Sequence, residues 1–319
     1  MTSPTPLHAL GIDTGGTSIK AAIVREDGHI VTHRNAPTPA DQDQYLETVA
    51  ALVEELSEYA QGAGLEVIDT VGLDTPGLVN DAAGIVEYSA SLGWRDFPVR
   101  DLAAKRLDRP VAYGHDVRNG ALAESYWGAD HANFFYIAIG TGIATVLILN
   151  HEPVATGGWV GEMGQLVTNP GSDTPLRLEE VAAAGGIAKR GHAAGLITAE
   201  QGAADVYALA DAGNEAAQAI VEAATEALAA ALAPVISALG PIPIVIGGGL
   251  ANRGQTLFEE LAQALAPRLG EIPLPPIEGA QLGSWSQVQG AACRAFHQTS
   301  SASGNANADP AAGPGKDGK

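Results

Sequence analysis

The chain has 319 residues, of which 46% are hydrophobic and 17% are charged, so it can bury one large core or two medium ones. Asp and Glu number 37 against 17 Lys and Arg, which gives a formal net charge of −20. So acidic a composition argues against nonspecific binding to nucleic acid or to anionic membranes, because both need clustered basic residues. Phosphate ligands remain possible, since backbone N–H groups can bind them locally.

The cysteine content and the first residues also limit which kinds of protein this chain can be. The single cysteine, Cys293, excludes a disulfide within the chain and a zinc site built from several cysteines. The first residues lack the basic start and apolar core of a signal peptide. No charge lies within residues 227–252, but the prolines and glycines there favour a helix end, a turn and a buried strand over a membrane span. We expect a soluble, cytoplasmic protein without a membrane partner.

The first half of the chain predicts alternating strands and helices. Residues 9–12 and 21–24 flank a Gly-Gly turn, which is typical of a β-hairpin. Apolar residues then recur every three to four positions from Tyr45 to Leu56, which indicates an amphipathic helix starting near Asp41 or Asp43. Further strands are predicted at 30–34, 67–74 and 110–113, and a short helix at 101–107.

In the second half, residues 134–139 and 143–149 form a predicted strand pair, and a Gly-rich loop follows at 156–173. Another buried strand is predicted at 242–246. Helices are predicted at 119–127, 178–184, 203–212, 214–239 (with a possible kink at Pro234), 257–265 and 288–296. The small polar residues from 299 onward predict a disordered tail. Because the order of elements recurs loosely after about residue 130, two similar α/β halves are possible.

The turn Asp13-Thr14-Gly15-Gly16-Thr17 suits a phosphate ligand. Glycines let the backbone approach a ligand closely, and exposed N–H groups can bind phosphate oxygens. An Asp at the strand end can orient water or a magnesium ion. The turn matches neither GxxxxGK[ST] nor GxGxxG, and on its own it could be an ordinary hairpin turn.

Six segments carry a resemblance to a known family. They are, in order, GIDTGGTSIKAAIV, GLDTPGLV, HDVRNGALAE, IAIGTGIATVLILN, GGWVGEMGQ and IVIGGGLANRG. Together they resemble the ROK family of sugar kinases over about residues 10–296. The resemblance implies an α/β, actin-like (ribonuclease H-like) ATPase fold of two lobes with a cleft between them. The lobes would span residues 1–115, completed by a C-terminal helix at 286–298, and residues 116–285, with a disordered tail at 299–319.

The resemblance also implies an ATP-dependent carbohydrate kinase that uses Mg²⁺, acts on a hexose or amino sugar and forms a homodimer. The residues that match the family's ATP phosphate contacts are Asp13, Gly15, Gly16, Thr17, Lys20, Gly140, Thr141 and Gly142. Gly247, Gly248 and Gly249 match its adenosine-side turn, and Asp13 would hold Mg²⁺ together with the ATP phosphates. Alternatively, the second and third glycine runs simply end buried strands.

By the same resemblance, Asp116 in GHDVRN is the general base. It lies between a predicted strand and a predicted helix, at the sheet rim where α/β proteins bind ligands, although a helix N-cap is the alternative. The sugar-contacting Asn of the family is His115 here, and its second Asn is Arg118. Arg118 could contact an anionic group on the substrate or on phosphate, pair with Glu124, or have only a surface role.

The zinc motif of the family is missing. Gln165 stands where the family has a zinc-binding His, and the following residues, LVTNPGSDTPLRLEE, contain neither Cys nor His. Zinc needs about four N or S ligands, so we predict no structural zinc. Without it, the loop would be held by packing through Trp159 or Pro170, or would be mobile.

The residues that match the family's sugar contacts are His115, Glu162, Gln165 and Glu179. Glu180 could take the place of Glu179. Alternatively, both carboxylates simply begin a solvated helix, where the helix dipole favours them.

The leading hypothesis is therefore a sugar kinase in which Asp116 accepts the proton of the attacking hydroxyl. One alternative is a sugar-binding member of the family that has lost catalysis, and another is a kinase that uses polyphosphate. A third is a transcriptional repressor of the same family. The repressors carry an additional N-terminal DNA-binding domain. We do not expect one here, because the phosphate turn begins at Asp13 and the net charge is −20.

Overall fold

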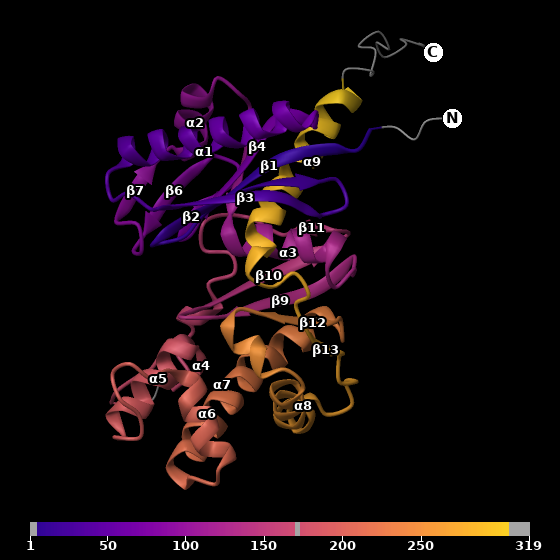
Figure 1. Ribbon diagram of the computed structural model, residues 1–319. Helices are drawn as coiled ribbons and strands as arrows, with labels where there is room; N and C mark the ends of the chain where they lie inside the picture. Colours follow the sequence, from indigo (N-terminus) through magenta and orange to yellow (C-terminus); the bar gives the residue numbers. More distant parts are fainter. Residues whose placement is uncertain (1–4, 170–172, 306–319) are drawn as a thin grey trace, which may run out of the picture. The chain divides into compact units, whose positions relative to one another are not determined.

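The computed structural model describes residues 5–169 and 173–305 (Figure 1). The chain divides into two compact units. Unit 1 comprises the residues up to Asn119 together with those from Gln287 onward, and unit 2 comprises Gly120–Ser286. Both units mix strands and helices, in agreement with the predicted α/β class.

Unit 1 is built on a five-stranded sheet with the order β3-β2-β1-β4-β8. The strands β1 (Leu7–Thr14), β2 (Ser18–Arg25) and β3 (Ile30–Pro37) are antiparallel, while β4 (Glu66–Thr75) and β8 (Val111–His115) run parallel to β1. All five predicted strands are confirmed, each slightly longer than expected. The register pairs Asp13 with Asp74 and Asp74 with Gly114, so three strands end at one sheet edge.

Two helices cover one face of this sheet. In α1 (Gln42–Ala63), Asp41 is the N-cap, and its side chain accepts a hydrogen bond of 2.9 Å from the backbone N–H of Gln44. The buried face of α1 packs with α2 (Val99–Leu107) and with the strands, in a core that includes Leu10, Ile12, Tyr45, Leu56 and Leu73. The predicted amphipathic pattern from Tyr45 to Leu56 therefore identifies the buried face.

The last helix, α9 (Ser286–Asn305), lies against the other face of the sheet, and Figure 1 shows it beside β1 and β4. It is longer than predicted, because residues 299–305 are helical where composition predicts a disordered tail. The Thr299 hydroxyl donates to the carbonyl of Ala295 and to Thr70 of β4, contacts that composition does not reveal. The rest of the predicted tail, 306–319, lies outside the described residues.

A small antiparallel sheet of β5 (Leu78–Asn80), β6 (Ile85–Ser89) and β7 (Trp94–Phe97) was not predicted. Its strands are too short to show a clear alternation of apolar and polar residues. Trp94 anchors it by edge-on contacts with the rings of Tyr45 and Phe97.

Unit 2 repeats the hairpin-plus-parallel-strand pattern. β9 (Asn133–Ile139) and β10 (Ile143–Leu149) form an antiparallel pair, and β12 (Ile244–Gly247) runs parallel to β9. The short strands β11 (Glu152–Pro153) and β13 (Ile277–Gly279) complete the sheet, whose order is β11-β10-β9-β12-β13. The glycine turns that follow β9 and β12 therefore lie at the same sheet edge.

Five helices contribute to the hydrophobic core of unit 2. They are α4 (Leu178–Ala182), α5 (Ala184–Ala193), α6 (Ala203–Asp211), α7 (Glu215–Leu239) and α8 (Gln255–Leu269). By length and composition α7 could cross a membrane, but its apolar residues, such as Leu228 and Leu232, belong to the core of unit 2. The uncharged stretch 227–252 contains the end of α7, then a turn, then β12, as predicted.

Candidate active site

The turn between β1 and β2 is a tight hairpin with an exposed tip. The backbone N–H of Gly15 donates to the carbonyl of Ser18 at 2.9 Å, and the Thr38 hydroxyl donates to the carbonyl of Gly15 at 2.7 Å. Gly16 and Thr17 at the tip are exposed. The loop is therefore held from inside the fold, while its tip remains open to a ligand such as phosphate.

Two carboxyl groups lie together where β1 and β4 end. Asp13 is nearly buried and lies 3.9 Å from the Lys20 ammonium, and Asp74 is completely buried. Burial raises the pKa of both groups, and the negative charges of Asp13 and Asp116 raise the pKa of Asp74 further. A hydrogen bond between the two carboxyls requires a proton on one of them. We assign that proton to Asp74, since Lys20 favours the anionic form of Asp13.

Asp74 is a site residue that the sequence analysis missed. One of its oxygens accepts a hydrogen bond of 3.0 Å from the side-chain amide of Asn119, and its other oxygen has no donor among the described residues unless a carboxyl proton is counted. Its position in the sequence could have indicated a role. Asp74 lies at the end of a buried strand before Thr75-Pro76-Gly77, much as Asp13 lies at the end of a strand before its own turn.

Asp116 begins α3 (Asp116–Trp127), so this helix starts earlier than the predicted residue 119. Its side chain is 22% exposed, and one carboxylate oxygen accepts a 2.7 Å hydrogen bond from the backbone N–H of Val117. Asp116 is close enough to Asp74 to raise the pKa of that buried carboxyl. The predicted base and the predicted magnesium ligand Asp13 are thus both neighbours of Asp74, at one edge of one sheet.

The structure places His115 inside the protein. Its Nδ1 atom lies 3.1 Å from the backbone nitrogen of Val117 and 3.1 Å from a carboxylate oxygen of Asp116, and the ring also donates to the carbonyl of Gly77. Burial, together with the nearby Arg118 guanidinium, lowers the pKa of His115 to about 3, so the ring is neutral. Both ring nitrogens therefore have partners within unit 1, and the expected sugar contact stays a prediction.

None of the three roles predicted for Arg118 fits its surroundings. Its guanidinium is buried and pairs with Asp81 at 2.7 Å, and it also donates to the carbonyl of Val79 at 2.7 Å. The positive charge of Arg118 is thus paired with Asp81 inside unit 1, and not with Glu124. Glu124 instead accepts backbone hydrogen bonds within unit 2, from Gln281 and Leu282.

The Arg118–Asp81 pair belongs to a wider network that includes α9. Arg294 lies 3.3 Å from the Asp81 carboxylate and donates to the Asn119 side chain at 2.6 Å. Asn119 in turn donates to Asp74. A continuous set of polar contacts therefore joins the buried carboxyl at the end of β4 to the start of α3 and to the last helix.

In unit 2, the structure brings the second and third glycine turns together. The backbone N–H of Gly140 donates to the carbonyl of Gly142 at 3.0 Å, and Thr141 between them is exposed. Gly248 has a φ of 78°, and a Cβ atom there would lie within 2.8 Å of the Ile139 backbone. Only glycine allows this close approach, so the turn after β12 packs directly beside the end of β9.

The predicted sugar-binding residues of unit 2 come from two separate segments. Glu162 is the residue before the 3₁₀ turn η1 (Met163–Gln165), Gln165 is the last residue of that turn, and Glu179 is on the first turn of α4. The side-chain amide of Gln165 donates to a Glu179 carboxylate oxygen at 3.0 Å. Glu180 instead accepts from the backbone N–H of Arg177 at 2.9 Å. Glu179, rather than Glu180, is thus the carboxylate that joins the two segments.

The chemistry of these donors fits Mg²⁺ and does not fit zinc. Mg²⁺ is usually held by one or two carboxylates together with substrate phosphates, and Asp13 can supply such an oxygen. Among the described residues, no group of three or more His, Cys, Asp and Glu side chains could hold a metal ion. Gln165 and its neighbours offer amide, guanidinium and carboxylate groups, whereas zinc needs several N or S ligands.

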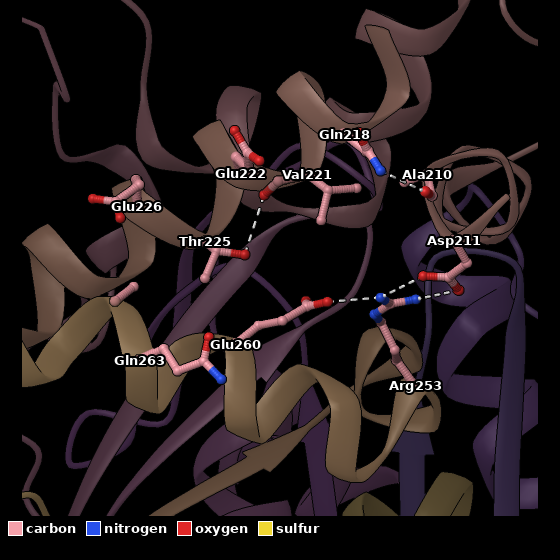
Figure 2. Close-up of a pocket in the computed structure, with 11 residues that line it drawn as sticks. Ala210, Asp211, Gln218, Val221, Glu222, Thr225, Glu226, Arg253, Glu260 and Gln263 are labelled. Atoms are coloured by element: carbon pink, nitrogen blue, oxygen red, sulfur yellow. Dashed lines mark hydrogen bonds and ion pairs between the residues drawn. The ribbon is translucent and has the colours of Figure 1, made fainter. Parts of the chain in front are cut away.

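A separate pocket of about 620 Å³ lies among α6, α7 and α8, and none of the predicted site residues lines it (Figure 2). Four carboxylates line this pocket, those of Asp211, Glu222, Glu226 and Glu260. Its one cation, Arg253, is paired with Asp211 at 3.0 Å and Glu260 at 2.8 Å. This acidic lining disfavours phosphate, so the pocket is not a candidate for the ATP phosphates.

Comparisons with known proteins identify the family of this chain. A family model described as "ROK family" matches residues 9–297. The glucokinase of Halalkalibacterium halodurans is 31% identical over 80% of this chain and 84% of its own length. The N-acetyl-D-glucosamine kinase of Haemophilus influenzae is 31% identical over 88% of this chain and 97% of its own length.

Among solved structures, the ROK hexokinase from Thermus thermophilus matches with a TM-score of 0.80 and 27% identity. The match covers 92% of this chain and 99% of the hexokinase. The fold is accordingly the actin-like ATPase fold of the ROK kinases, as the sequence motifs predicted. With the family model spanning nearly all of the described residues, this chain belongs to the ROK family.

Proposed function

We propose that this protein transfers the γ-phosphate of ATP to a hydroxyl group of a hexose or an amino sugar, with Asp116 as the general base. Its relatives by sequence are sugar kinases, and the protein is an ATP-dependent carbohydrate kinase of the ROK family. One observation carries the assignment of the base. Asp116 and Asp13, which come from different strand ends, lie at one sheet edge as neighbours of the same buried carboxyl, Asp74.

Phosphoryl transfer needs a positioned nucleophile, neutralisation of phosphate charge and an acceptor for the hydroxyl proton. The Asp116 carboxylate is anchored by the Val117 N–H and is partly exposed, so it can accept that proton from a bound sugar. Lys20 and a proton on Asp74 would favour the anionic form of Asp13, and Mg²⁺ bound there with ATP would supply charge neutralisation. Lys20, whose side chain is 30% exposed, adds a positive charge beside Asp13.

Unit 2 carries candidate ligand contacts of its own. The exposed turn at Gly140, Thr141 and Gly142 suits phosphate, and the neighbouring turn at Gly247–Gly249 suits the adenosine side. Glu162, Gln165 and Glu179 would bind sugar hydroxyls, because carboxylate and amide oxygens accept hydrogen bonds from hydroxyl groups.

A coupled assay across sugars and donors tests the reaction class. The purified protein is given glucose, mannose, N-acetylglucosamine and N-acetylmannosamine, each with Mg²⁺ and either ATP or polyphosphate. We expect a sugar phosphate from at least one sugar with ATP. Product with polyphosphate alone would identify a different donor. Sugar binding by calorimetry without product from either donor would identify a binding protein that has lost catalysis, and neither binding nor product would refute the assignment.

The base assignment is tested by Asp116→Asn. The amide keeps the size of the side chain but cannot accept the hydroxyl proton, so kcat should fall by roughly 10²- to 10⁴-fold. The sugar Kd, measured by calorimetry, should stay within about twofold of the wild type, since binding does not require the proton transfer. Asp43→Asn, an exposed change on α1, is the matched control and should keep the wild-type rate. A D116N enzyme with wild-type kcat would refute Asp116 as the base.

A further inference from the structure

The loop that carries the predicted sugar residues, here called the sugar loop and defined as residues 156–180, is not held by the packing that the sequence suggested. Trp159 is 69% exposed, so it does not anchor the loop, and Pro170 lies outside the described residues. Leu166 and Val167 are also about half exposed. Leu178 is fully buried in the core of unit 2 and Met163 packs against that core, so apolar packing holds the backbone on both sides of the loop. Polar contacts orient the side-chain ends of Gln165 and Glu179.

A closed triangle of side chains joins the two segments of the sugar loop. Arg177 Nη1 donates to the side-chain oxygen Oε1 of Gln165 at 2.9 Å and lies 3.0 Å from a carboxylate oxygen of Glu179. The Gln165 amide nitrogen donates to that same Glu179 oxygen at 3.0 Å. Each corner thus contacts both others, and neither Gln165 nor Glu179 can rotate away without breaking two contacts.

The backbone around Arg177 supports the triangle. Val167 and Arg177 form an antiparallel bridge, and the Leu178 N–H donates to the Leu166 carbonyl at 2.7 Å. The Glu180 carboxylate accepts from both the backbone N–H and the Nε atom of Arg177, at 2.9 and 3.2 Å. Arg177 therefore uses several donors of its planar group at once, which the single ammonium of a lysine cannot reproduce.

The triangle also sets the place of Glu179 relative to the second glycine turn. The other carboxylate oxygen of Glu179 is so close to Gly142 and Gly164 that a Cβ atom on either would lie 3.0 to 3.1 Å from it. A displaced Glu179 would change the spacing between the predicted sugar contact and the predicted phosphate turn. The position of this one carboxylate is thus fixed from two sides, by glycines and by Arg177.

We propose that Arg177 is a positioning residue that holds Gln165 and Glu179 for the sugar, in the place of the zinc ion implied by the resemblance to ROK kinases. The role in sugar binding rests on the proposed function. The residues present support the replacement of zinc by Arg177. The sugar loop has no Cys or His that could bind zinc, while Arg177 contacts both Gln165 and Glu179.

The test compares Arg177→Gln, Arg177→Lys and a control, Arg106→Gln. Arg106 is matched in kind, since it is a similarly exposed arginine paired with a glutamate, but it belongs to unit 1. For R177Q we expect a rise of about tenfold in the sugar KM and in the sugar Kd, with kcat within about threefold and the ATP KM unchanged. R177K should recover part of the loss, and R106Q should behave like the wild type.

Two readouts do not depend on activity. Hydrogen exchange of peptides covering residues 160–169 and 174–184 should speed up in R177Q and not in R106Q, because the triangle no longer ties the segments together. Zinc measured by mass spectrometry should be far below one ion per chain, and a chelator should not reduce sugar affinity. Unchanged exchange, an unchanged sugar Kd in R177Q, or stoichiometric zinc would each overturn the role of Arg177.

These readouts separate this inference from the proposed function. If the wild type binds sugar but phosphorylates none, the kinase assignment fails, while calorimetry and exchange still decide the role of Arg177. If the wild type phosphorylates sugar and R177Q shows wild-type affinity and exchange, the kinase assignment stands and the positioning role of Arg177 fails.

Discussion

At the scale of single residues, His115 gives the fold a dependence on pH. Its pKa is about 3 in the folded protein, because burial disfavours the charged ring, against an ordinary value of 6.5. The folded state therefore binds this proton more weakly than the unfolded chain does. The stability due to the neutral ring is fully present above pH 6.5 and is lost as the pH falls from 6.5 toward 3.

The loss should approach about 1.4 kcal/mol per pH unit at lower pH, and it amounts to roughly 2 kcal/mol between pH 6.5 and pH 4.5, because the unfolded histidine is already half protonated at pH 6.5. We expect His115→Asn to remove this part of the acid sensitivity, whatever it does to stability at neutral pH. Urea unfolding of both proteins at pH 7.5, 6.5, 5.5 and 4.5 measures it, since the contributions of other groups cancel in the difference. Parallel pH profiles for the two proteins would contradict the prediction.

The site was predictable where a residue belongs to a local motif. Asp13, Asp116 and the three glycine turns stand in segments whose order alone indicates a phosphate-binding kinase. Asp74 also belongs to one of these segments, GLDTPGLV, but the sequence did not indicate a role for it, because only the strand register places it beside Asp13. Arg118 was misread for the same reason. Its partner Asp81 is 37 residues away in the sequence and directly follows β5 of the small sheet, which was not predicted.

At the scale of elements, glycines decide how closely α9 approaches the sheet of unit 1. A Cβ atom at Gly11 would overlap the carbonyl of Val288, and one at Gly72 would overlap the carbonyl of Ala291. On the helix itself, a Cβ atom at Gly290 would overlap the carbonyl of Asn119. The backbone of α9 thus sits directly on the strands and on α3, without side chains between them.

We expect Gly72→Ala to destabilise unit 1 by about 1–3 kcal/mol or more, because the added methyl group must push α9 away. Gly62→Ala is the matched control, since Gly62 lies in α1 with no atom within 4 Å of the added group. The control should raise stability by roughly 0.5–1 kcal/mol through helix propensity. Denaturant unfolding of the three proteins measures both effects, and a G72A variant as stable as G62A would refute the close packing.

Long periodic elements such as α1 and α7 were predictable, whereas the glycine-rich helix α5 was not predicted. The sequence of α5, AGGIAKRGHA, contains three glycines and argues against a helix. Packing overrides this preference, because a Cβ atom at Gly186 would overlap backbone carbonyls of α4 and one at Gly191 would lie 2.6 Å from Val206. The glycines that weaken the helical propensity are thus the residues that let α5 fit.

At the scale of the whole molecule, the net charge of −20 works against compactness, since excess like charges repel each other. Salt screens this repulsion, so raising NaCl from 10 to 300 mM should raise the Tm by about 2–4 °C, the equivalent of about 1 kcal/mol. Calorimetry in NaCl and in KCl measures it, and equal effects of the two salts would exclude a specific cation. A Tm that falls with salt would show that attractive ion pairs dominate instead.

The membership of α9 in unit 1 has a consequence for synthesis on the ribosome. β4 ends at Thr75 and α9 starts at Ser286, 211 positions later in the chain. At 5–20 residues per second, translation takes roughly 10–40 s to cover that distance. During this time the face of β1 and β4 that carries Gly11 and Gly72 is not covered by α9, because α9 has not yet been synthesised. Gly120–Ser286 is synthesised in the same interval as one continuous stretch. The half that is made first is therefore completed last, and its uncovered strands are the part of the nascent chain that a chaperone would have to protect.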